Sequence, residues 1–431
     1  MRNSLCTLLL LLISQSVFSA AKIEYWQTVQ GSPVYFVKTE GLPMVDVRVI
    51  FDAGSARDGG QQGIASLTSD LLDTGAGNLT ADDIAQQFES VGAQFGAGVS
   101  KDTAWVSVRS LTKGKLLNKA LKTMKLILTK PAFNEMDFQR EKNRTLAGLK
   151  HREESPGALA SIEFFKALYK DHPYAHPESG IVETVSGFSV DDLRKFYTQF
   201  YVANNAKVII VGDVDKKQAE KIAQSLIEDL PRGVKPDIIP EVPFTAKAMT
   251  KKIHFPSSQT HVLAGVIGMK RGDKDYLSLY VGNHILGGSG LVSKLTDEVR
   301  EKRGLAYSAY SYFSPLFRKG PFVMGLQTRN DQTSQAVDVM QNTLKDFVQN
   351  GPTEKALVAA KKNITGGFAM RFDTNSKLIS YVSMIAFYQL PLDYLDTFQQ
   401  RVQAVTVDSI KDAFKRRVKP ELINTIIVGG E

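Results

Sequence analysis

An internal repeat constrains the fold of this sequence more than any other feature. Residues 190–197 lead through a short loop to residues 207–212, and residues 407–414 lead in the same way to residues 424–429. Both segments of the second copy lie 217 residues after those of the first. In each copy an Asp is expected to cap a helix, and the β-branched run that follows is typical of a buried strand. A period this long excludes a solenoid and predicts two homologous halves.

The order of signals within each half predicts the fold class. Strands come first, then helices, a hairpin, more helices and a final strand. The clearest signals in the first half are a strand over 45–51, a helix over 63–72, a helix start at 80–83 and a hairpin of 94–99 with 103–108. Helices gathered beside a mostly antiparallel sheet are typical of α+β proteins. We therefore predict an α+β fold of two homologous halves, each a mostly antiparallel sheet with helices packed on it, which together form a clamshell.

A proline-spaced segment separates the halves. Residues 233–243 contain three prolines and cannot form a regular helix. The predicted organisation is an N-terminal domain over 22–232, a linker over 233–246 and a C-terminal domain over 247–431.

The N-terminus is typical of a secretory signal peptide, predicted over residues 1–21. A positive charge at Arg2 precedes a short apolar run, and small residues up to Ala21 suit cleavage. Cleavage removes Cys6, the only cysteine, so the mature chain would have no thiolate nucleophile, no thiolate metal ligand and no disulfide. We expect an exported protein, in the periplasm of a bacterium that has one.

Charge and hydropathy exclude two further classes. The formal net charge is +8, and basic residues are interleaved with acidic ones along the whole chain. No segment resembles a basic arm for nucleic acid, and no later run is long and apolar enough for stable membrane insertion.

Arg300 and Tyr307 form the most specific candidate site. A helix predicted to begin at Leu291 would end near Gly304, with Arg300 in its last turn and Tyr307 at the start of an aromatic strand. The two donors could hold one peptide oxygen that gains charge during acyl chemistry. The alternative is structural, since an Arg at a helix C-terminus complements the dipole and a strand Tyr is often half-buried. Tyr310, Tyr312 and Phe313 would likewise line a peptide groove or simply form a half-buried face.

Several motifs together resemble the pitrilysin/insulinase family of zinc peptidases, the inverzincins, in its short two-half form. The matching residues, in order, are Gly54-Ser-Ala-Arg-Asp58, Gly63-Ile-Ala65, Glu141, His172-Pro-Tyr174, Leu286-Gly-Gly-Ser-Gly-Leu291 and Glu298-Val-Arg-Glu-Lys-Arg-Gly-Leu-Ala-Tyr-Ser308. Prolines around His172 and His176 favour a structural turn there over a metal site.

The zinc motif of that family is degraded in this sequence. Active members carry H-x-x-E-H, whose two His bind zinc and whose Glu activates the bound water. Ser66 stands at the first His position, Ser69 at the general base and Asp70 at the second His. Gly148 stands where the third ligand, a Glu, would lie. A lone carboxylate does not hold catalytic zinc, so we expect no catalytic residue, metal or cofactor in this chain.

The resemblance implies a role for the Arg/Tyr pair that this chain keeps. In the family, Arg300 and Tyr307 would bind substrate backbone opposite the zinc site, and short-form members can work as heterodimers. We therefore predict a non-catalytic, substrate-binding subunit whose partner is a homologous, zinc-bearing chain with intact H-x-x-E-H, acting on unfolded peptides. The main alternative is a peptidase-derived binding or scaffold protein, and a self-sufficient peptidase with a non-standard metal site is a third possibility.

Overall fold

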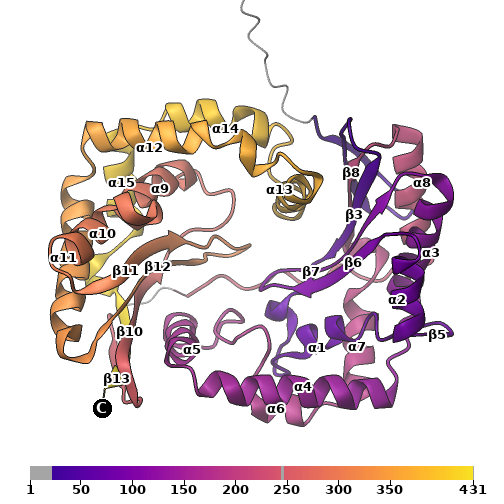
Figure 1. Ribbon diagram of the computed structural model, residues 1–431, viewed down its shortest axis with the longest axis horizontal. Coiled ribbons are helices and arrows are strands. Elements are labelled where there is room, and N and C mark those ends of the chain that lie inside the picture. Colours follow the sequence, from indigo (N-terminus) through magenta and orange to yellow (C-terminus); the bar gives the residue numbers. More distant parts are fainter. Residues whose placement is uncertain (1–21, 244–246, 431) are drawn as a thin grey trace, which may run out of the picture.

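The computed structural model describes residues 22–243 and 247–430 (Figure 1). The signal peptide predicted for residues 1–21, with Cys6 inside it, and the last three residues of the predicted linker lie outside the described residues. The strands form two large sheets, which stand on opposite sides of the molecule in Figure 1, and one small two-stranded ribbon. Each large sheet takes its strands from one side of residues 231–243, a segment without helix or strand.

The first sheet has six strands in the order β1-β2-β8-β3-β7-β6. Neighbours run antiparallel except β2 and β8, which are parallel. The strands are β1 (Glu24–Gln27), β2 (Pro33–Lys38), β3 (Met44–Phe51), β6 (Gln94–Val99), β7 (Ala104–Leu111) and β8 (Ala206–Gly212), and the ribbon is β4 (Gly75–Ala76) with β5 (Leu79–Thr80). The predicted strand over 45–51 and the predicted hairpin are both confirmed, as β3 and as β6–β7.

The second sheet has five strands in the order β11-β12-β10-β13-β9. Only β9 and β13 are parallel, as β2 and β8 are in the first sheet. The strands are β9 (Thr250–Ile253), β10 (Ser257–Ile267), β11 (Ala306–Phe313), β12 (Pro321–Arg329) and β13 (Asn424–Gly430). Strand β11 lies at one edge, so one side of its backbone has no neighbouring strand within the sheet.

Helices surround both sheets, which confirms the predicted α+β class. The first half contributes α1 (Ile64–Asp70), α2 (Ala81–Glu89), α3 (Gly114–Thr129), α4 (Glu135–Glu153), α5 (Pro156–Tyr169), α6 (Val182–Ser186), α7 (Val190–Phe200) and α8 (Lys216–Ile227). The second contributes α9 (Tyr276–Asn283), α10 (Lys294–Thr296), α11 (Thr333–Asn350), α12 (Glu354–Gly366), α13 (Asn375–Tyr388), α14 (Tyr394–Gln403) and α15 (Val407–Arg417), with π-helical turns η3 (His284–Gly288) and η5 (Asp297–Glu301). Among residues 22–243 and 247–430, no helix has the length and apolar character that a bilayer crossing requires.

The repeat found in the sequence is confirmed as two helix–strand units, α7 with β8 and α15 with β13. The prediction that an Asp caps each helix is wrong. Ser189 and Thr406 are the N-caps, and each accepts a hydrogen bond from the backbone N–H three residues later. Asp192 instead completes the first capping box by accepting the backbone N–H of Ser189 at 3.0 Å.

Two helices are exchanged between the halves. Helix α5, from the first half, packs on β10 and β13 of the second sheet, where Gly265 leaves room for the ring of Phe164. Helix α13, from the second half, packs on β3 and β8 of the first sheet. One polar contact crosses this packing, since Arg48 on β3 donates to the hydroxyl of Ser383 on α13 at 3.4 Å. Apolar side chains of β3 accordingly point to both faces of the sheet. Val47 lies in the core of the first half, and Ile50 lies in the core that contains α13.

A buried carboxylate also joins the halves. Asp102, in the β6–β7 turn, is fully buried and accepts hydrogen bonds from the Tyr174 hydroxyl at 2.6 Å and the Tyr388 hydroxyl at 2.9 Å. It also accepts the backbone N–H of Phe317 at 2.8 Å. Tyr388 lies on α13 and Phe317 in the β11–β12 loop, so one side chain connects three segments of both halves.

Candidate functional site

Arg300 and Tyr307 lie against each other, as the sequence predicted. Arg300 is in the π-helical turn η5, and Tyr307 is the second residue of β11. The guanidinium carbon of Arg300 lies 4.7 Å from the centroid of the Tyr307 ring. Gly304, with φ of 62°, makes the turn between them, and its N–H donates to the carbonyl of Arg300 at 2.8 Å.

The helix before the pair is shorter than predicted. It does not begin at Leu291, because α10 starts at Lys294 with Ser293 as N-cap. Gly290 breaks the preceding turn with φ of 64°, and Leu291 is exposed while Leu295 and Val299 are buried. The helix then widens into η5, a π-helical turn of a kind often found at functional sites.

The pair is open to solvent. Tyr307 is 83% exposed, and no hydrogen bond among the described residues uses its hydroxyl. The Arg300 side chain is 32% exposed, and its only ion pair in that part of the chain is a loose contact of 3.4 Å with exposed Glu301. Both side chains therefore have donors available to a ligand. The structural alternative, a half-buried Tyr307 and an Arg300 that only complements the helix dipole, does not require such donors.

A β-bulge places Tyr307. Ala306 pairs with Thr328 and Ser308 with Gln327, so Tyr307 is the extra residue on β11. Bulges re-aim one side chain and are frequent next to active sites. A cavity of about 250 Å³ adjoins the bulge and is lined by polar side chains that include Gln259, Gln327 and Gln332.

The aromatic strand beyond Tyr307 is divided between surface and core. Tyr310 and Tyr312 are 39% and 41% exposed, and their rings stack at 6.1 Å. Phe313 packs instead on buried Phe322, with ring centroids 4.7 Å apart. Gly325, which the sequence did not single out, lies opposite Tyr310 on β12, and a Cβ there would lie 2.4 Å from the Tyr310 ring. Only the two tyrosines are thus available to a bound peptide.

The degenerate zinc positions lie on two neighbouring helices. Ser66 and Asp70 occupy one face of α1, and Ser69, three residues after Ser66, is buried. Gly148 lies on α4, exposed, and a Cβ added there would meet no atom within 4 Å. Among the residues that the structure describes, no three His, Cys, Asp or Glu side chains are grouped as a metal site requires.

A buried carboxylate beside these positions is paired with arginines. Glu141, the residue of α4 that matches the family, is buried, and its carboxylate lies 2.7 Å from the guanidinium of Arg144. Arg140 lies 3.3 Å from the same carboxylate. The cations that face Glu141 are therefore side chains of its own helix.

The turn before α1 has a structural role. The Asp58 carboxylate accepts the N–H of Gly63 at 2.7 Å and that of Ala65 at 3.0 Å, which fixes the start of α1. The turn around His172 is also structural, as predicted, because one nitrogen of that ring accepts the N–H of Tyr174 and the other lies 3.0 Å from the carbonyl oxygen of Pro240.

Asp58 should make the stability of the protein pH-dependent. Burial raises its pKa to about 7, whereas an unfolded Asp has a pKa near 4. The folded chain thus keeps a proton that the unfolded chain releases, so the free energy of unfolding should fall as pH rises from about 4 to about 7. We expect this fall to be about 4 kcal/mol larger in the wild type than in Asp58→Asn, measured by urea unfolding. Equal falls in the two proteins would contradict the assignment.

Comparisons with known proteins agree with this geometry. A model of "Insulinase (Peptidase family M16)" matches residues 34–179, and a model of "Peptidase M16 inactive domain" matches residues 187–364. The crystal structure of a peptidase M16 inactive domain from Pseudomonas fluorescens is 37% identical with a TM-score of 0.92, over 95% of this chain and 98% of that chain. The chain belongs to peptidase family M16.

Relatives within M16 have names of both kinds, inactive homologue and zinc protease. The "Non-peptidase homolog YmxG" of Helicobacter pylori is 26% identical over 404 residues, 93% of this chain and 92% of the relative. An "Uncharacterized zinc protease YmxG" of Bacillus subtilis is 27% identical over 317 residues, 73% of this chain and 76% of the relative. The predicted resemblance to the insulinase-type family is confirmed, and this chain is an inactive M16 homologue.

Proposed function

We propose that this M16 chain is the non-catalytic, substrate-binding subunit of an exported heterodimeric zinc metallopeptidase that acts on unfolded peptides. One observation carries the proposal. The chain keeps a stacked Arg300–Tyr307 pair with free donors, while Ser66, Ser69 and Gly148 replace the residues that a zinc site needs. A subunit that complements a zinc-bearing partner is expected to lack the zinc ligands and to keep the Arg/Tyr pair.

The pair would act on the substrate backbone. Zinc in the partner would supply an activated water, since zinc lowers the pKa of bound water to about 7. Arg300 and the Tyr307 hydroxyl would donate to the carbonyl oxygen of the bond that is cleaved. Their stacking restricts both side chains beforehand, so little ordering is needed when charge develops on an oxygen.

Strand β11 would bind the rest of the peptide. Its free edge offers backbone groups to an extended chain, and backbone pairing does not depend on the peptide sequence. Tyr310 and Tyr312 would contact alternate side chains through their exposed rings. Such a surface suits unfolded peptides of varied sequence.

A binding protein without proteolysis is the second candidate. The edge strand and its tyrosines would hold a peptide whether or not a zinc-bearing partner exists, and the Helicobacter pylori relative is named a non-peptidase homologue. Export to the periplasm belongs to both proposals and rests on the predicted signal peptide.

The test is a peptidase assay with metal analysis on the mature chain and on the homologous chain with intact H-x-x-E-H from the same genome. We expect no stoichiometric zinc and no cleavage with this chain alone, and strong activation of the partner when the two are mixed. Chelator-sensitive cleavage by this chain alone would overturn the proposal. Normal partner activity without this chain would favour the binding protein.

A gain-of-metal variant is the matched control. Ser66→His, Ser69→Glu, Asp70→His and Gly148→Glu together restore the family ligands and the base, and Gly148 has open space for a side chain. We expect this quadruple variant to hold about one zinc per chain under conditions where the wild type holds none. If both bind zinc equally, the ligand assignment is wrong.

A further inference from the structure

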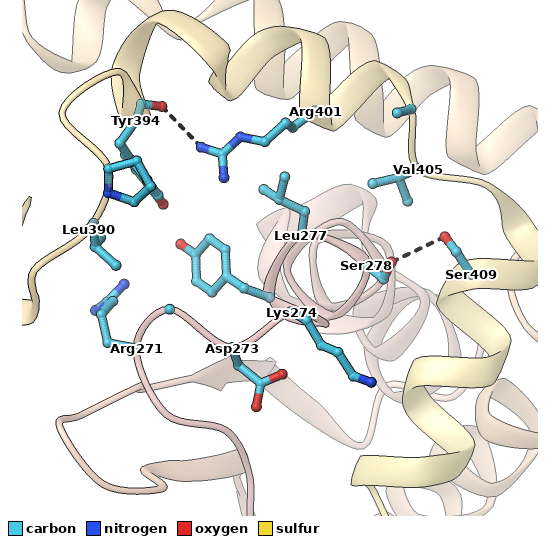
Figure 2. Close-up of a pocket in the computed structure, with 14 residues that line it drawn as sticks. Arg271, Asp273, Lys274, Leu277, Ser278, Leu390, Tyr394, Arg401, Val405 and Ser409 are labelled. Atoms are coloured by element: carbon cyan, nitrogen blue, oxygen red, sulfur yellow. Dashed lines mark hydrogen bonds between the residues drawn. The ribbon is translucent and has the colours of Figure 1, made fainter.

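A second cavity, outside the Arg300–Tyr307 site, carries an excess of positive charge. It has a volume of about 450 Å³ and lies in the C-terminal half, between the start of α9 and helices α14 and α15 (Figure 2). Arg271 and Lys274 line it from the loop before α9, and Arg401 lines it from α14. Asp273 is the one acidic side chain in the lining of this cavity.

The acid does not neutralise these bases. The carboxylate of Asp273 is engaged at 2.8 Å by Arg417, which is not part of the lining. Neither Arg271, Lys274 nor Arg401 makes an ion pair with any residue that the structure describes. Three cations therefore border the cavity with no anion assigned to them, and such a concave, partly buried cluster attracts negative charge.

The two guanidinium groups are partly desolvated and short of acceptors. The Nε–H of Arg271 and that of Arg401 are buried, and neither finds an acceptor among the described residues. In Figure 2 the Arg401 guanidinium extends toward the middle of the cavity, with one hydrogen bond of 3.1 Å to the Tyr394 carbonyl, and Arg271 lies across from it. Since these Nε–H groups are closed off from solvent, an anion in the cavity would accept hydrogen bonds from the terminal Nη groups.

Aromatic and apolar groups form the remaining walls. Arg401 lies over the ring of Tyr394 at 4.8 Å and Arg271 over that of Tyr276 at 5.8 Å, so the rings restrict both guanidinium groups. Leu390 closes one side, against Gly272, whose φ of 76° turns the loop next to Arg271. The volume falls in the range of roughly 300–1,000 Å³ that is usual for sites of small organic ligands.

We infer that this cavity binds a small organic anion, namely one carboxylate or phosphate group on an apolar or aromatic body. The anionic group would lie between Arg271 and Arg401, which can each donate two parallel hydrogen bonds to such a group. The apolar body would contact Leu390 and the tyrosine rings. The inference does not depend on the proposed peptidase role, since none of these residues belongs to the Arg300–Tyr307 site.

The test is calorimetric titration of the mature chain with benzoate, phenyl phosphate and the neutral analogue benzyl alcohol. We expect at least one of the two anions to bind and benzyl alcohol not to bind, and the tighter anion identifies the group that the cavity prefers. Arg271→Gln and Arg401→Gln should each weaken binding by about tenfold or more, because each removes a charged hydrogen bond. Arg232→Gln, an exposed site in the segment between the halves, is the charge-matched control and should leave binding unchanged.

A measurement on the wild type covers the case in which a variant fails to fold. Phenylglyoxal modifies accessible arginines, and peptide mass spectrometry locates the modified residues. The bound anion should protect Arg271 and Arg401 but not Arg232. Absence of binding by both anions at millimolar concentration, or equal modification with and without them, would overturn the inference.

Discussion

Replacement of Asp102 with Ala should lower the free energy of unfolding by about 3 kcal/mol, because it removes the acceptor of three hydrogen bonds. The carboxylate is fully buried and accepts three hydrogen bonds, from the hydroxyls of Tyr174 and Tyr388 and from the N–H of Phe317. Alanine would leave the buried Tyr174 hydroxyl and the two partly buried donors without this acceptor. Urea unfolding followed by circular dichroism would measure the loss.

Two matched variants distinguish loss of the hydrogen-bond network from a mere change of side chain at position 102. Tyr388→Phe removes one donor and keeps the carboxylate, so we expect a loss of only about 1 kcal/mol. Asp102→Asn keeps the shape and one acceptor and should fall between the two. A loss below that of Tyr388→Phe for Asp102→Ala would show that the carboxylate does not join the halves.

Replacement of Arg300 with Ala, or of Tyr307 with Phe, should lower the kcat of the proposed heterodimer by about 100-fold. Removal of one donor to a developing oxyanion usually costs about 10²–10³ in kcat. Because Tyr307 is largely exposed, neither change should disturb folding or assembly, which size-exclusion chromatography would check. The effect should lie mainly in kcat rather than KM, since the donors would act on charge that exists only in the transition state.

The same turn and strand provide controls. Arg303→Ala removes a neighbouring Arg that pairs with Glu298 at 2.6 Å, and Tyr310→Phe removes a neighbouring hydroxyl. Both should leave kcat within about twofold of the wild type, because Arg303 is outside the pair and Tyr310→Phe keeps the ring that would contact the peptide. An unchanged kcat in Arg300→Ala and in Tyr307→Phe would remove the pair from the proposed mechanism.

Local signals in the sequence predicted most of the secondary structure. The alternating residues of β3, the β6–β7 hairpin and the two repeated helix–strand units depend on short-range patterns. The start of α10 was misplaced because the four-residue apolar spacing already begins at Leu291. The helix begins only after the N-cap Ser293, and Gly290 just before Leu291 has a positive φ. Periodicity does not detect such an interruption.

The candidate site was predicted only in part, because sequence patterns report on residues that are close along the chain. Arg300 and Tyr307 are close in sequence, so a turn at Gly304 was enough to bring them together. The bulge at Tyr307 and the space left by Gly325 depend on the pairing with β12, which no local pattern specifies. The Asp102 network and the cavity around Arg271 and Arg401 join segments more than a hundred residues apart, and only the fold brings them together.

The exchange of α5 and α13 bears on how this chain arose. The two helices begin at Pro156 and Asn375, 219 residues apart, so they are equivalent members of the duplicated unit. Each leaves its own unit to cover the sheet of the other, which is the arrangement that two identical polypeptides adopt in a domain-swapped dimer. A gene for a single unit would encode a protein that buries its sheet only by pairing with a second copy. Fusion of two such genes would then have let the two halves diverge, with Ser66, Asp70 and Gly148 in one half and Arg300 and Tyr307 in the other.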